Sequence, residues 1–380
     1  MKRKSNKQEP IPDPEHLTEQ ERVAGERSRL LFKTLRNETF SATEKDALWN
    51  QVGETISQKK QRSFNTFWIA AAASVTLLLL AGVGYLVFYE DSARVMQDVA
   101  SKARDIPEET RLILADKRSI NLRKENSSVV YQQNGALIQV DSSSTIGQQV
   151  AGDQQFNTLI VPYGKRSVLT LSDGTRIWLN SGSKLVYPTH FDKGQREVYL
   201  EGQAYFAVTH AENAPFYVHT KDMEVKVLGT EFDVSAYDDD AYTATVLTKG
   251  SVELTTQRQT LFGSKKTKIT PGTRAIFDQQ QAVLQTQQVD VQEYVSWKDG
   301  SLVLNVAPLG EILRKVMRYY RVDIELKQPE LAGVKFRGSL ILQDDVRDVL
   351  KGLALTTGLN YKQQPNNERR YVLEESTIKQ

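Results

Sequence analysis

The chain has 380 residues, and its 49 Lys and Arg nearly balance its 47 Asp and Glu, so that the formal net charge is +2. This balance excludes a protein that binds nucleic acid by charge over its whole length. The complete absence of cysteine excludes disulfides, thiolate metal sites and thiol nucleophiles.

Residues 1–63 are predicted to form a short helical module with little core of its own. The sequences Thr18–Glu21 and Ser41–Glu44 both fit a capping box and indicate helix starts. The apolar residues that follow are too few for an independent core, so the module is either a solvated stub or completes its core on a partner. The stripe that we predict to face a partner consists of Leu31, Leu35, Leu48, Trp49, Val52 and Ile56.

One membrane-spanning helix is predicted over residues 64–89. The run from Phe67 to Tyr89 holds 23 residues and no charge, which is enough to cross a hydrocarbon core of about 30 Å. The alternative, a buried core helix, rarely runs so long without a charge, and a cleaved signal peptide would lie at the N-terminus. Three cations between residues 59 and 62 directly precede the run. They predict a cytoplasmic N-terminus and an external C-terminus.

Residues 90–107 are predicted to form a polar helical stalk, and residues 108–289 an all-β domain of stacked hairpins. Arg111–Leu122 and Val168–Leu179 share one pattern, in which two alternating strands flank a turn at an aspartate. The second copy carries Asp173-Gly174, a signal for a two-residue hairpin turn, whereas the first carries Lys117-Arg118. The repeat therefore predicts two similar hairpins.

Residues 290–380 are predicted to form a small α+β domain with the order βαββαβ. Pro308 begins a helix whose apolar residues recur at helical spacing. This predicted apolar face consists of Leu309, Ile312, Leu313, Val316 and Tyr320. Asp344 or Asp345 caps a second helix, which ends at Gly358.

No sequence motif indicates a metal site, a bound cofactor or a catalytic set. The four histidines, His16, His190, His210 and His219, do not pair at metal-ligand spacing, and each is predicted to be exposed or hydrogen-bonded. Asp238–Asp240 is predicted to be a solvated loop rather than a calcium loop, because no bidentate glutamate follows at the required spacing.

Gly229-Thr230 is a candidate for self-cleavage. A threonine hydroxyl can attack the preceding glycine carbonyl where the backbone is strained. The alternative is an ordinary turn between strands.

Several motifs follow one another in an order that identifies a family. They are Tyr163–Arg166, Leu171–Asn180, Arg196–Phe206, Pro215–Val218, Val227–Val234, Gly250–Glu253 and Trp297–Gly300. With these motifs the chain resembles the FecR family of transmembrane regulators over residues 108–375, and over residues 15–89 in layout. The C-terminal domain resembles the short domain at the N-termini of secretins and TonB-linked receptors. Gln203 departs from the family pattern, which usually has Glu there.

The resemblance implies an anti-sigma factor, or sigma regulator, in the bacterial inner membrane, with its C-terminal domains in the periplasm. The implied partners are an extracytoplasmic-function sigma factor in the cytoplasm and the signalling domain of an outer-membrane TonB-dependent transducer. The lipid bilayer and envelope proteases are further partners, and no direct contact with nucleic acid is expected. Some members cleave themselves at the Gly-Thr pair. Apart from that single-turnover step at Gly229-Thr230, no enzyme activity and no cofactor are implied.

Two other classes of protein are alternatives. A membrane-anchored glycan-binding protein or enzyme of the envelope would have a cleft of convergent acids or aromatics within residues 108–289. A structural envelope scaffold would tolerate the loss of residues 1–63.

Overall fold

The computed structural model describes residues 92–375 and a few residues before them. The gaps in the main range are 104, 125, 133–134, 143, 149–154, 192–193, 257–265 and 344. Before residue 92 only residues 26, 29, 33, 41–44, 46–47 and 50 are described. The chain divides into two compact units, Met1–Tyr89 and Glu90–Gln380.

The predicted helix start at Ser41 is present in the first unit. The Ser41 backbone N–H donates to Glu44 Oε2 at 3.0 Å, which is the glutamate half of a capping box. The Ser41 hydroxyl donates to the same carboxylate oxygen at 2.9 Å. The predicted partner-facing residues Leu31, Leu35, Leu48, Trp49, Val52 and Ile56 lie outside the described residues.

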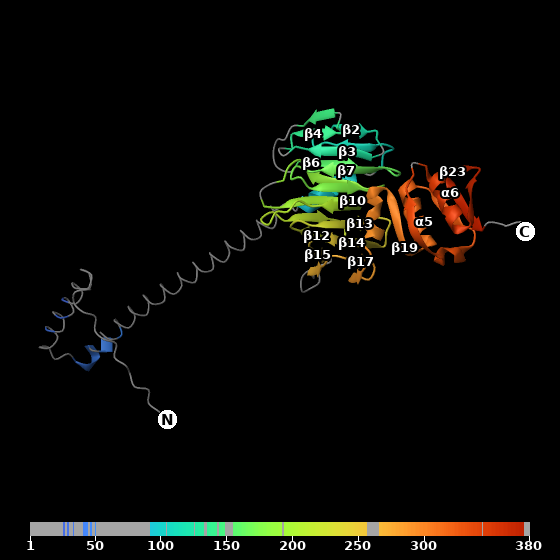
Figure 1. Ribbon diagram of the computed structural model, residues 1–380. Coiled ribbons are helices and arrows are strands. Elements are labelled where there is room, and N and C mark those ends of the chain that lie inside the picture. The colour runs from blue at the N-terminus through green and yellow to red at the C-terminus, as the bar shows by residue number, and fades with distance from the viewer. Residues whose placement is uncertain are drawn as a thin grey trace, which may run out of the picture. The chain divides into compact units, whose positions relative to one another are not determined.

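The β domain consists of two facing layers of short strands (Figure 1). In spatial order, the first layer contains β2 (Ser119–Leu122), β1 (Thr110–Ile113), β6 (Phe156–Ile160), β9 (Lys184–Pro188), β10 (Arg196–Ala207), β11 (Phe216–His219), β12 (Met223–Val227), β15 (Val252–Thr256) and β16 (Lys266–Ile269). The second layer contains β5 (Ser144–Gly147), β4 (Leu137–Val140), β3 (Asn126–Tyr131), β7 (Arg166–Thr170), β8 (Arg176–Leu179), β10 again, β13 (Glu231–Ala236), β14 (Tyr242–Lys249), β17 (Thr273–Asp278) and β18 (Val283–Gln288).

Successive hairpins alternate between the two layers, so the prediction of stacked hairpins is confirmed. The hairpins β11–β12 and β15–β16 lie in the first layer, and β13–β14 and β17–β18 lie in the second. Alternate side chains point inward along strands such as β7 and β17, where buried and half-buried residues alternate. The core between the layers includes the stacked rings of Phe206 and Phe232, whose centroids are 5.1 Å apart.

Among the strands that the structure describes, β10 is the one that both layers share. Its first half pairs with β9 through Tyr199–Glu201, and its second half pairs with β8 and β13 from Gly202 onward. Gly202 has φ +100°, and a Cβ there would lie 2.5 Å from Ser183 Oγ and 2.7 Å from Ser183 Cα. The strand therefore passes from one layer to the other where only glycine fits.

The two predicted similar hairpins have the same turn. Leu112 pairs with Ile120 in one, and Leu169 pairs with Ile177 in the other. In the second hairpin the Leu171 N–H donates to the Thr175 carbonyl and the Gly174 N–H donates to the Leu171 carbonyl. The turn therefore has three residues rather than the two we predicted. This is a type I turn followed by a left-handed residue.

The left-handed position in the first hairpin is occupied by a lysine. Lys117 has φ 69° where the second hairpin has Gly174 at φ 83°. Aspartate at the preceding position supports both turns, because its Oδ1 accepts the N–H two residues on in each case. The Asx turn thus keeps the same geometry with a non-glycine residue.

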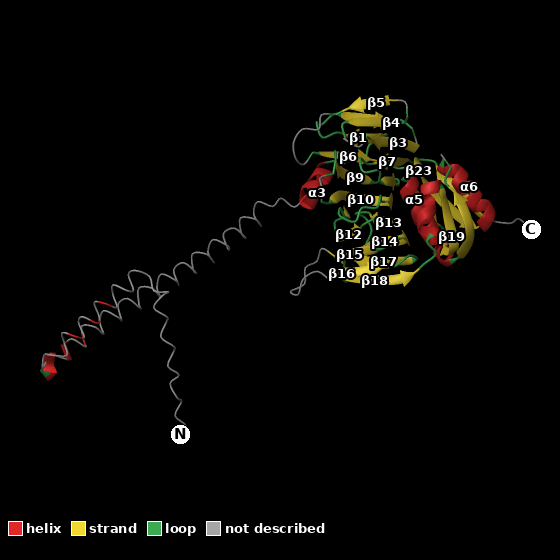
Figure 2. Cartoon of the chain, turned by 60° about the vertical axis from the view of Figure 1, so that its left-hand side comes forward, coloured by secondary structure: helices red, strands yellow, loops and turns green. Residues whose placement is uncertain are grey.

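Helix α3 (Ser92–Lys102) packs against the β domain instead of standing free as a stalk (Figure 2). Its buried residues Met96 and Ala100 contact Val186 and Tyr199 of β9 and β10. Lys184 Nζ donates to the Ala100 carbonyl at 2.8 Å near the end of the helix, where carbonyls lack partners within the helix.

The start of α3 is also held by β10. The Ser92 hydroxyl donates to Glu197 Oε2, and His219 Nε2 lies 3.3 Å from the same carboxylate oxygen. Burial alone would raise the pKa of Glu197, but the close contact with His219 and the hydrogen bond from Ser92 lower it below its usual value. Polar contacts therefore fix both ends of α3, with an apolar contact between them.

Replacing Met96 with alanine is expected to loosen α3. Truncating a fully buried methionine removes about 2 kcal/mol or more of packing. Hydrogen exchange of the α3 amides should therefore accelerate by roughly tenfold or more, because each 1.4 kcal/mol is a factor of ten. Asp98→Ala, at an exposed position of the same helix, is the control. Equal exchange rates in M96A and the unaltered chain would contradict the docking described here.

The C-terminal domain begins after a short link formed by α4 (Gln292–Val295) and a 3-10 turn (Ser296–Asp299). Its elements are β19 (Ser301–Pro308), α5 (Leu309–Tyr320), β20 (Asp323–Leu326), a second 3-10 turn (Pro329–Gly333), β21 (Lys335–Ile341), α6 (Val346–Thr357), β22 (Leu359–Gln364) and β23 (Asn367–Glu375). The order is therefore βαββαββ, with one strand more than predicted, because β22 and β23 form a C-terminal hairpin. β19 pairs with β21, and β20 runs parallel to β23.

The two predicted helices of this domain are confirmed, with one difference. Asp345 caps α6 by accepting the Arg347 N–H, and Gly358 ends it at φ 69°. In α5 the predicted apolar residues are buried except at the last turn, where Tyr319 is buried and Tyr320 is only half-buried. Tyr319 is buried where α5 meets the β domain, and its carbonyl is bound there by Gly164 and Ser181.

Candidate functional site

A buried carboxylate lies where the β domain meets the C-terminal domain. Asp233 on β13 is 2% exposed, and its carboxylate accepts hydrogen bonds from Gln203 Nε2 at 2.9 Å and from Trp297 Nε1 at 3.0 Å. Burial raises the pKa of Asp233 to about 7, although both hydrogen bonds and the nearby cations Lys315 and Arg274 act in the opposite direction. Trp297 comes from the link before β19, so this contact joins the two domains.

Two backbone carbonyls of the C-terminal part accept further hydrogen bonds from the β domain. The Tyr319 carbonyl at the end of α5 accepts from the Gly164 N–H and from the Ser181 hydroxyl, both at 2.6 Å. The Trp297 carbonyl accepts from Arg166 Nη1 at 2.7 Å. The Tyr319 carbonyl lies in the last turn of α5, where carbonyls lack partners within the helix, and the Trp297 carbonyl also accepts the Gly300 N–H within its own turn.

An arginine on α5 forms a bidentate ion pair between the domains. Arg318 donates through both terminal nitrogens to Asp240, at 2.7 and 2.6 Å, and also contacts Asp239 at 3.2 Å. Its guanidinium stacks 4.2 Å from the centroid of the Tyr237 ring. The prediction that Asp238–Asp240 is a solvated loop is therefore wrong for Asp240, which binds Arg318.

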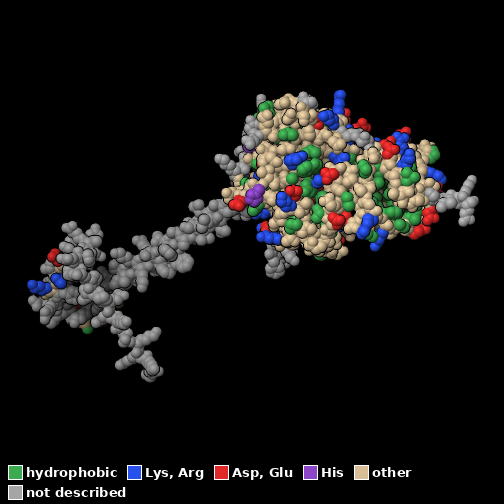
Figure 3. Space-filling view, viewed as in Figure 1, with side chains coloured by type: hydrophobic (Ala, Val, Ile, Leu, Met, Phe, Trp, Pro, Cys, Tyr) green, Lys and Arg blue, Asp and Glu red, His purple; other side chains and the backbone are tan. Residues whose placement is uncertain are grey.

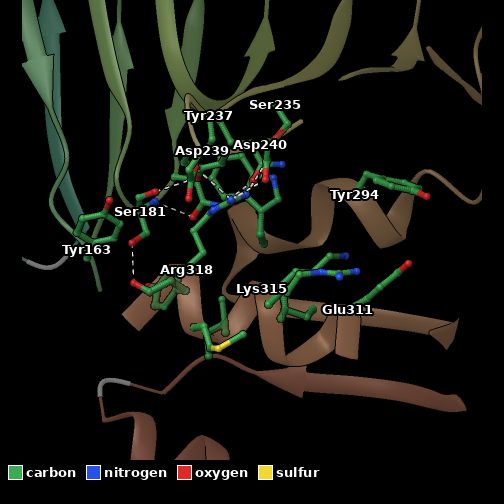
Figure 4. A pocket seen from close by; sticks show the side chains of 18 of the residues that line it. Tyr163, Ser181, Ser235, Tyr237, Asp239, Asp240, Tyr294, Glu311, Lys315 and Arg318 are labelled. Carbon is green, nitrogen blue, oxygen red and sulfur yellow. Dashed lines mark hydrogen bonds and ion pairs between the residues drawn. The ribbon is translucent and has the colours of Figure 1, made fainter. Parts of the chain in front are cut away.

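A cavity of about 700 Å³ lies beside these contacts, with walls from both domains (Figure 4). Figure 4 shows Ser181, Tyr237, Asp239 and Asp240 on the β-domain side, and Glu311, Lys315 and Arg318 projecting from α5. Its lining combines tyrosine rings with several cations and carboxylates. A cavity of this size and mixed character is typical of a small-molecule site.

Gly229-Thr230 lies outside this cavity and shows no strained backbone. Gly229 is absent from the glycines with positive φ, and the Thr230 hydroxyl donates to the Ser251 carbonyl at 3.0 Å. Glycine is nevertheless required, because a Cβ at this position would lie 2.5 Å from His210 Nδ1 and 2.6 Å from His210 Cα. Close packing of His210 therefore accounts for the glycine.

The described histidines fit the structural roles predicted for them. His210 is 65% exposed and lies 3.9 Å from Glu212, and His219 is buried between Glu197 and Glu224. His190 contacts the Thr189 hydroxyl at 3.3 Å. His16 lies outside the described residues. No group of three or more His, Asp or Glu side chains positioned to hold a metal ion occurs in the part of the chain that the structure describes.

Two family models match the chain, one in each of the joined domains. Residues 157–253 match the family described as FecR protein, and residues 301–372 match the one described as FecR, C-terminal. The chain belongs to the FecR family. The FecR family is one of regulatory proteins.

This FecR-family chain is also similar to solved structures. Two crystal structures, at 1.65 and 2.50 Å resolution, of a candidate anti-sigma factor from Parabacteroides distasonis are similar to it at 29% sequence identity. The similarity covers 58% of this chain and 99% and 100% of those chains, with a TM-score of 0.49 for each. Among the curated proteins none matches the sequence.

The FecR motifs recognised in the sequence converge on the contact between the two domains. Gly164 and Arg166 come from the first motif, Gln203 from the third, Asp233 from the fifth and Trp297 from the last, and each makes a hydrogen bond described above. The motifs thus mark an interface more than a catalytic centre.

Gln203, where the FecR family usually has glutamate, affects the buried Asp233 beside it. The Gln203 amide nitrogen donates to Asp233, while its oxygen accepts from Asn180 Nδ2 at 2.8 Å. A glutamate here would place a second carboxyl against Asp233, and the two could not both ionise. Gln203 therefore supplies a donor that supports the Asp233 carboxylate.

Sequence reasoning missed Asp233, Arg274 and Lys315 as site residues. The signal available for Asp233 was an acidic residue between the apolar Phe232 and Val234 of a predicted strand. Arg274 and Lys315 had no such signal, because exposed cations on strands and helices are common.

No helix in the described part of this FecR chain has both the length and the apolar character needed to cross a membrane. The span predicted over residues 64–89 lies outside that part.

Proposed function

We propose that this FecR-family protein is a single-pass anti-sigma factor of the bacterial inner membrane. In this proposal it relays a signal from an outer-membrane TonB-dependent transducer to a cytoplasmic extracytoplasmic-function sigma factor. The observation that carries the proposal is the order along the chain: a charged, partner-dependent tail, one uncharged run of membrane-spanning length, and the two matched FecR domains. The family supports the sigma-regulator role.

The orientation follows from the charges that flank the uncharged run. Three cations between residues 59 and 62 support a cytoplasmic N-terminal tail, and the proposal then has the FecR domains in the periplasm. In that arrangement the tail meets the sigma factor, and the two folded domains meet the signalling domain of the transducer.

One strand offers a physical route between the C-terminal domain and the start of the folded exterior. The second half of β10 carries Gln203, which binds Asp233, and Tyr205, which packs with the C-terminal core. The first half carries Glu197 and Tyr199, which contact α3. A change in the domain contact would therefore act on the same strand that holds α3, which begins three residues after Tyr89.

Trp49→Ala is expected to weaken binding of the sigma factor. We predict that Trp49 lies in the partner-facing stripe, and loss of a buried Trp at such a contact costs about 2 kcal/mol or more. The dissociation constant should then rise by roughly 30-fold. The measurement is a titration of the full chain, purified in detergent, with the extracytoplasmic-function sigma factor encoded beside it.

The neighbouring exposed helical residue provides the matched control. Asn50→Ala should leave the affinity unchanged, because Asn50 is exposed in a helix and polar. Undiminished binding by W49A would overturn the assignment of the stripe, and failure of the unaltered chain to bind the sigma factor would overturn the proposed function itself.

The alternative of a glycan-binding protein or enzyme required a cleft formed within residues 108–289. The cavity that the structure describes takes part of its wall from α5 and from the link before β19, outside that range. No specific observation favours this alternative over the sigma-regulator role.

Self-cleavage at Gly229-Thr230 and processing by envelope proteases stay predictions. The Thr230 hydroxyl donates to the Ser251 carbonyl, so attack on the Gly229 carbonyl would require that hydrogen bond to break.

A further inference from the structure

We infer that the cavity between the β domain and the C-terminal domain is a binding site for a small organic anion, held between Arg274 and Lys315. Arg274 belongs to β17 of the β domain and Lys315 to α5 of the C-terminal domain. The volume of about 700 Å³ admits a molecule of several heavy atoms. A ligand there would touch both domains at once. The inference does not depend on the sigma factor or on the membrane span.

The described residues that line the cavity carry more unpaired positive than unpaired negative charge. Arg318 is neutralised by Asp239 and Asp240. Five other lining cations come within 4 Å of no described carboxylate, namely Arg274, Arg314, Lys315, Arg321 and Arg369. The lining carboxylates without an ion pair are Asp233, Glu293 and Glu311. Over the whole lining six cations face six carboxylates, so the positive charge that favours an anionic ligand is local to the cations without an ion pair.

One of these acids contributes little negative charge. Asp233 is fully buried and hydrogen-bonded to Gln203 and Trp297, and its burial raises its pKa to about 7. It is therefore partly protonated at neutral pH, which lowers its repulsion of an anion nearby.

Arg274 is held in a fixed orientation by two tyrosine rings. Its guanidinium carbon lies 5.5 Å from the centroid of Tyr242 and 4.8 Å from that of Tyr294. Its Nε is buried and has no hydrogen-bond partner. A planar guanidinium fixed in this way is suited to bind a carboxylate or phosphate through two parallel hydrogen bonds.

Lys315 approaches the same tyrosine from α5. Its Nζ lies 5.7 Å from the Tyr294 centroid and donates to the Glu293 carbonyl at 3.2 Å, which leaves two of its hydrogens for another acceptor. The pKa of Lys315 is lowered by burial, raised by the carboxylates of Glu311 and Glu293, and lowered by repulsion from the nearby Arg274. An anion between the two cations would remove this repulsion.

The covered tyrosine rings argue against a neutral sugar as the ligand. Arg321 lies over the Tyr163 ring at 5.1 Å, and Arg318 lies over Tyr237 at 4.2 Å. Tyr294 already has two cations at its ring. The aromatic faces on which a sugar would stack are thus engaged by cations, while the cations keep free donors.

Calorimetric titration of the full chain in detergent tests this site. The probes are succinate, citrate and glucose 6-phosphate, with glucose as the neutral counterpart of the last. At least one of the three anions is expected to bind saturably, and glucose is expected not to bind. Arg274→Gln and Lys315→Gln should each weaken that binding by at least roughly tenfold, the loss of about one charged hydrogen bond.

Lys335→Gln, an exposed lysine on β21 away from the cavity, is the control and should bind like the unaltered chain. The Lys315 side chain as a whole is exposed, so K315Q is expected to keep the fold even where R274Q does not. Absence of saturable binding of all three anions at millimolar concentration overturns the inference. Binding that neither R274Q nor K315Q weakens, or equal binding of glucose, overturns it as well.

Discussion

Asp233→Asn is expected to remove the largest pH-dependent part of the stability of the exterior domains. The pKa of Asp233 is raised by burial from the usual 3.8 to about 7 in the folded protein. Between these two values the folded state binds a proton that the unfolded state has released, so the free energy of unfolding falls as the pH rises. Three pKa units correspond to about 4 kcal/mol, present below pH 4 and lost by pH 7.

The groups that face Asp233 determine how large this loss becomes. Gln203 and Trp297 donate hydrogen bonds to the carboxylate, and Lys315 and Arg274 act on it through their charges. All four favour the ionised form, and burial outweighs them. An asparagine keeps the size of the side chain and cannot ionise, so D233N isolates this one titration.

Chemical unfolding of the full chain at several pH values between 4 and 8 measures the effect. Relative to the unaltered chain, D233N should gain stability steadily as the pH rises from 4 to 7 and change no further above that. Glu212→Gln changes a carboxyl that is 82% exposed, so its free energy of unfolding should depend on pH in the same way as that of the unaltered chain. A difference between D233N and the unaltered chain that is independent of pH would show that Asp233 is ionised throughout.

The elements that the sequence predicted best are those whose signals are local. The Asp345 cap, the Gly358 end of α6 and the alternating hairpins depend on residues close in sequence, and the structure has them all. The three-residue turn at Ser172–Gly174 was missed because Asp173-Gly174 fits two turn types that differ by one residue. Local patterns give the element but not always its length.

Errors in the C-terminal domain arise from contacts that are distant in sequence. Helical spacing favours Tyr320 on the apolar face of α5, yet Tyr319 is the buried one. Its carbonyl binds Gly164 and Ser181, which lie far earlier in the chain. No periodicity within α5 contains that information.

The cavity could not be predicted from the sequence either, because it is formed by residues that are distant in the chain. Its walls come from β17, α5 and the link at Trp297, and only their packing brings Arg274, Lys315 and Asp233 together. Each of the three is an ordinary residue of its own strand or helix in the sequence. The helix α3 was expected as a stalk for a similar reason, since Met96 and Ala100 are too few to predict a docked face.

Gly202→Ala is expected to be strongly destabilising, because it disturbs the strand on which both contacts of the relay depend. A Cβ at Gly202 would lie 2.5 Å from Ser183 Oγ and 2.7 Å from Ser183 Cα, and the backbone atom cannot move aside cheaply. The positive φ of +100° adds its own cost. Together these predict a loss of about 3 kcal/mol or more in the free energy of unfolding.

A second glycine separates the two causes of this loss. Gly164 has φ +80°, and a Cβ there would meet no atom within 4 Å. Gly164→Ala should therefore lower the free energy of unfolding only through the strained backbone conformation, by about 1–2 kcal/mol. The variant keeps the N–H that binds the Tyr319 carbonyl. Equal losses in G202A and G164A would show that the layers can separate to admit a methyl group at the crossing.

The damage in G202A should also reach α3. Glu201 directly precedes the crossing, and its carboxylate holds Lys184 at 2.6 Å, whose Nζ donates to the Ala100 carbonyl of α3. A displaced crossing would move Glu201 and loosen that end of the helix, so hydrogen exchange of α3 should accelerate in G202A and stay unchanged in G164A. If α3 is equally protected in both variants, β10 does not couple the domain contact to the helix. The relay would then require another route.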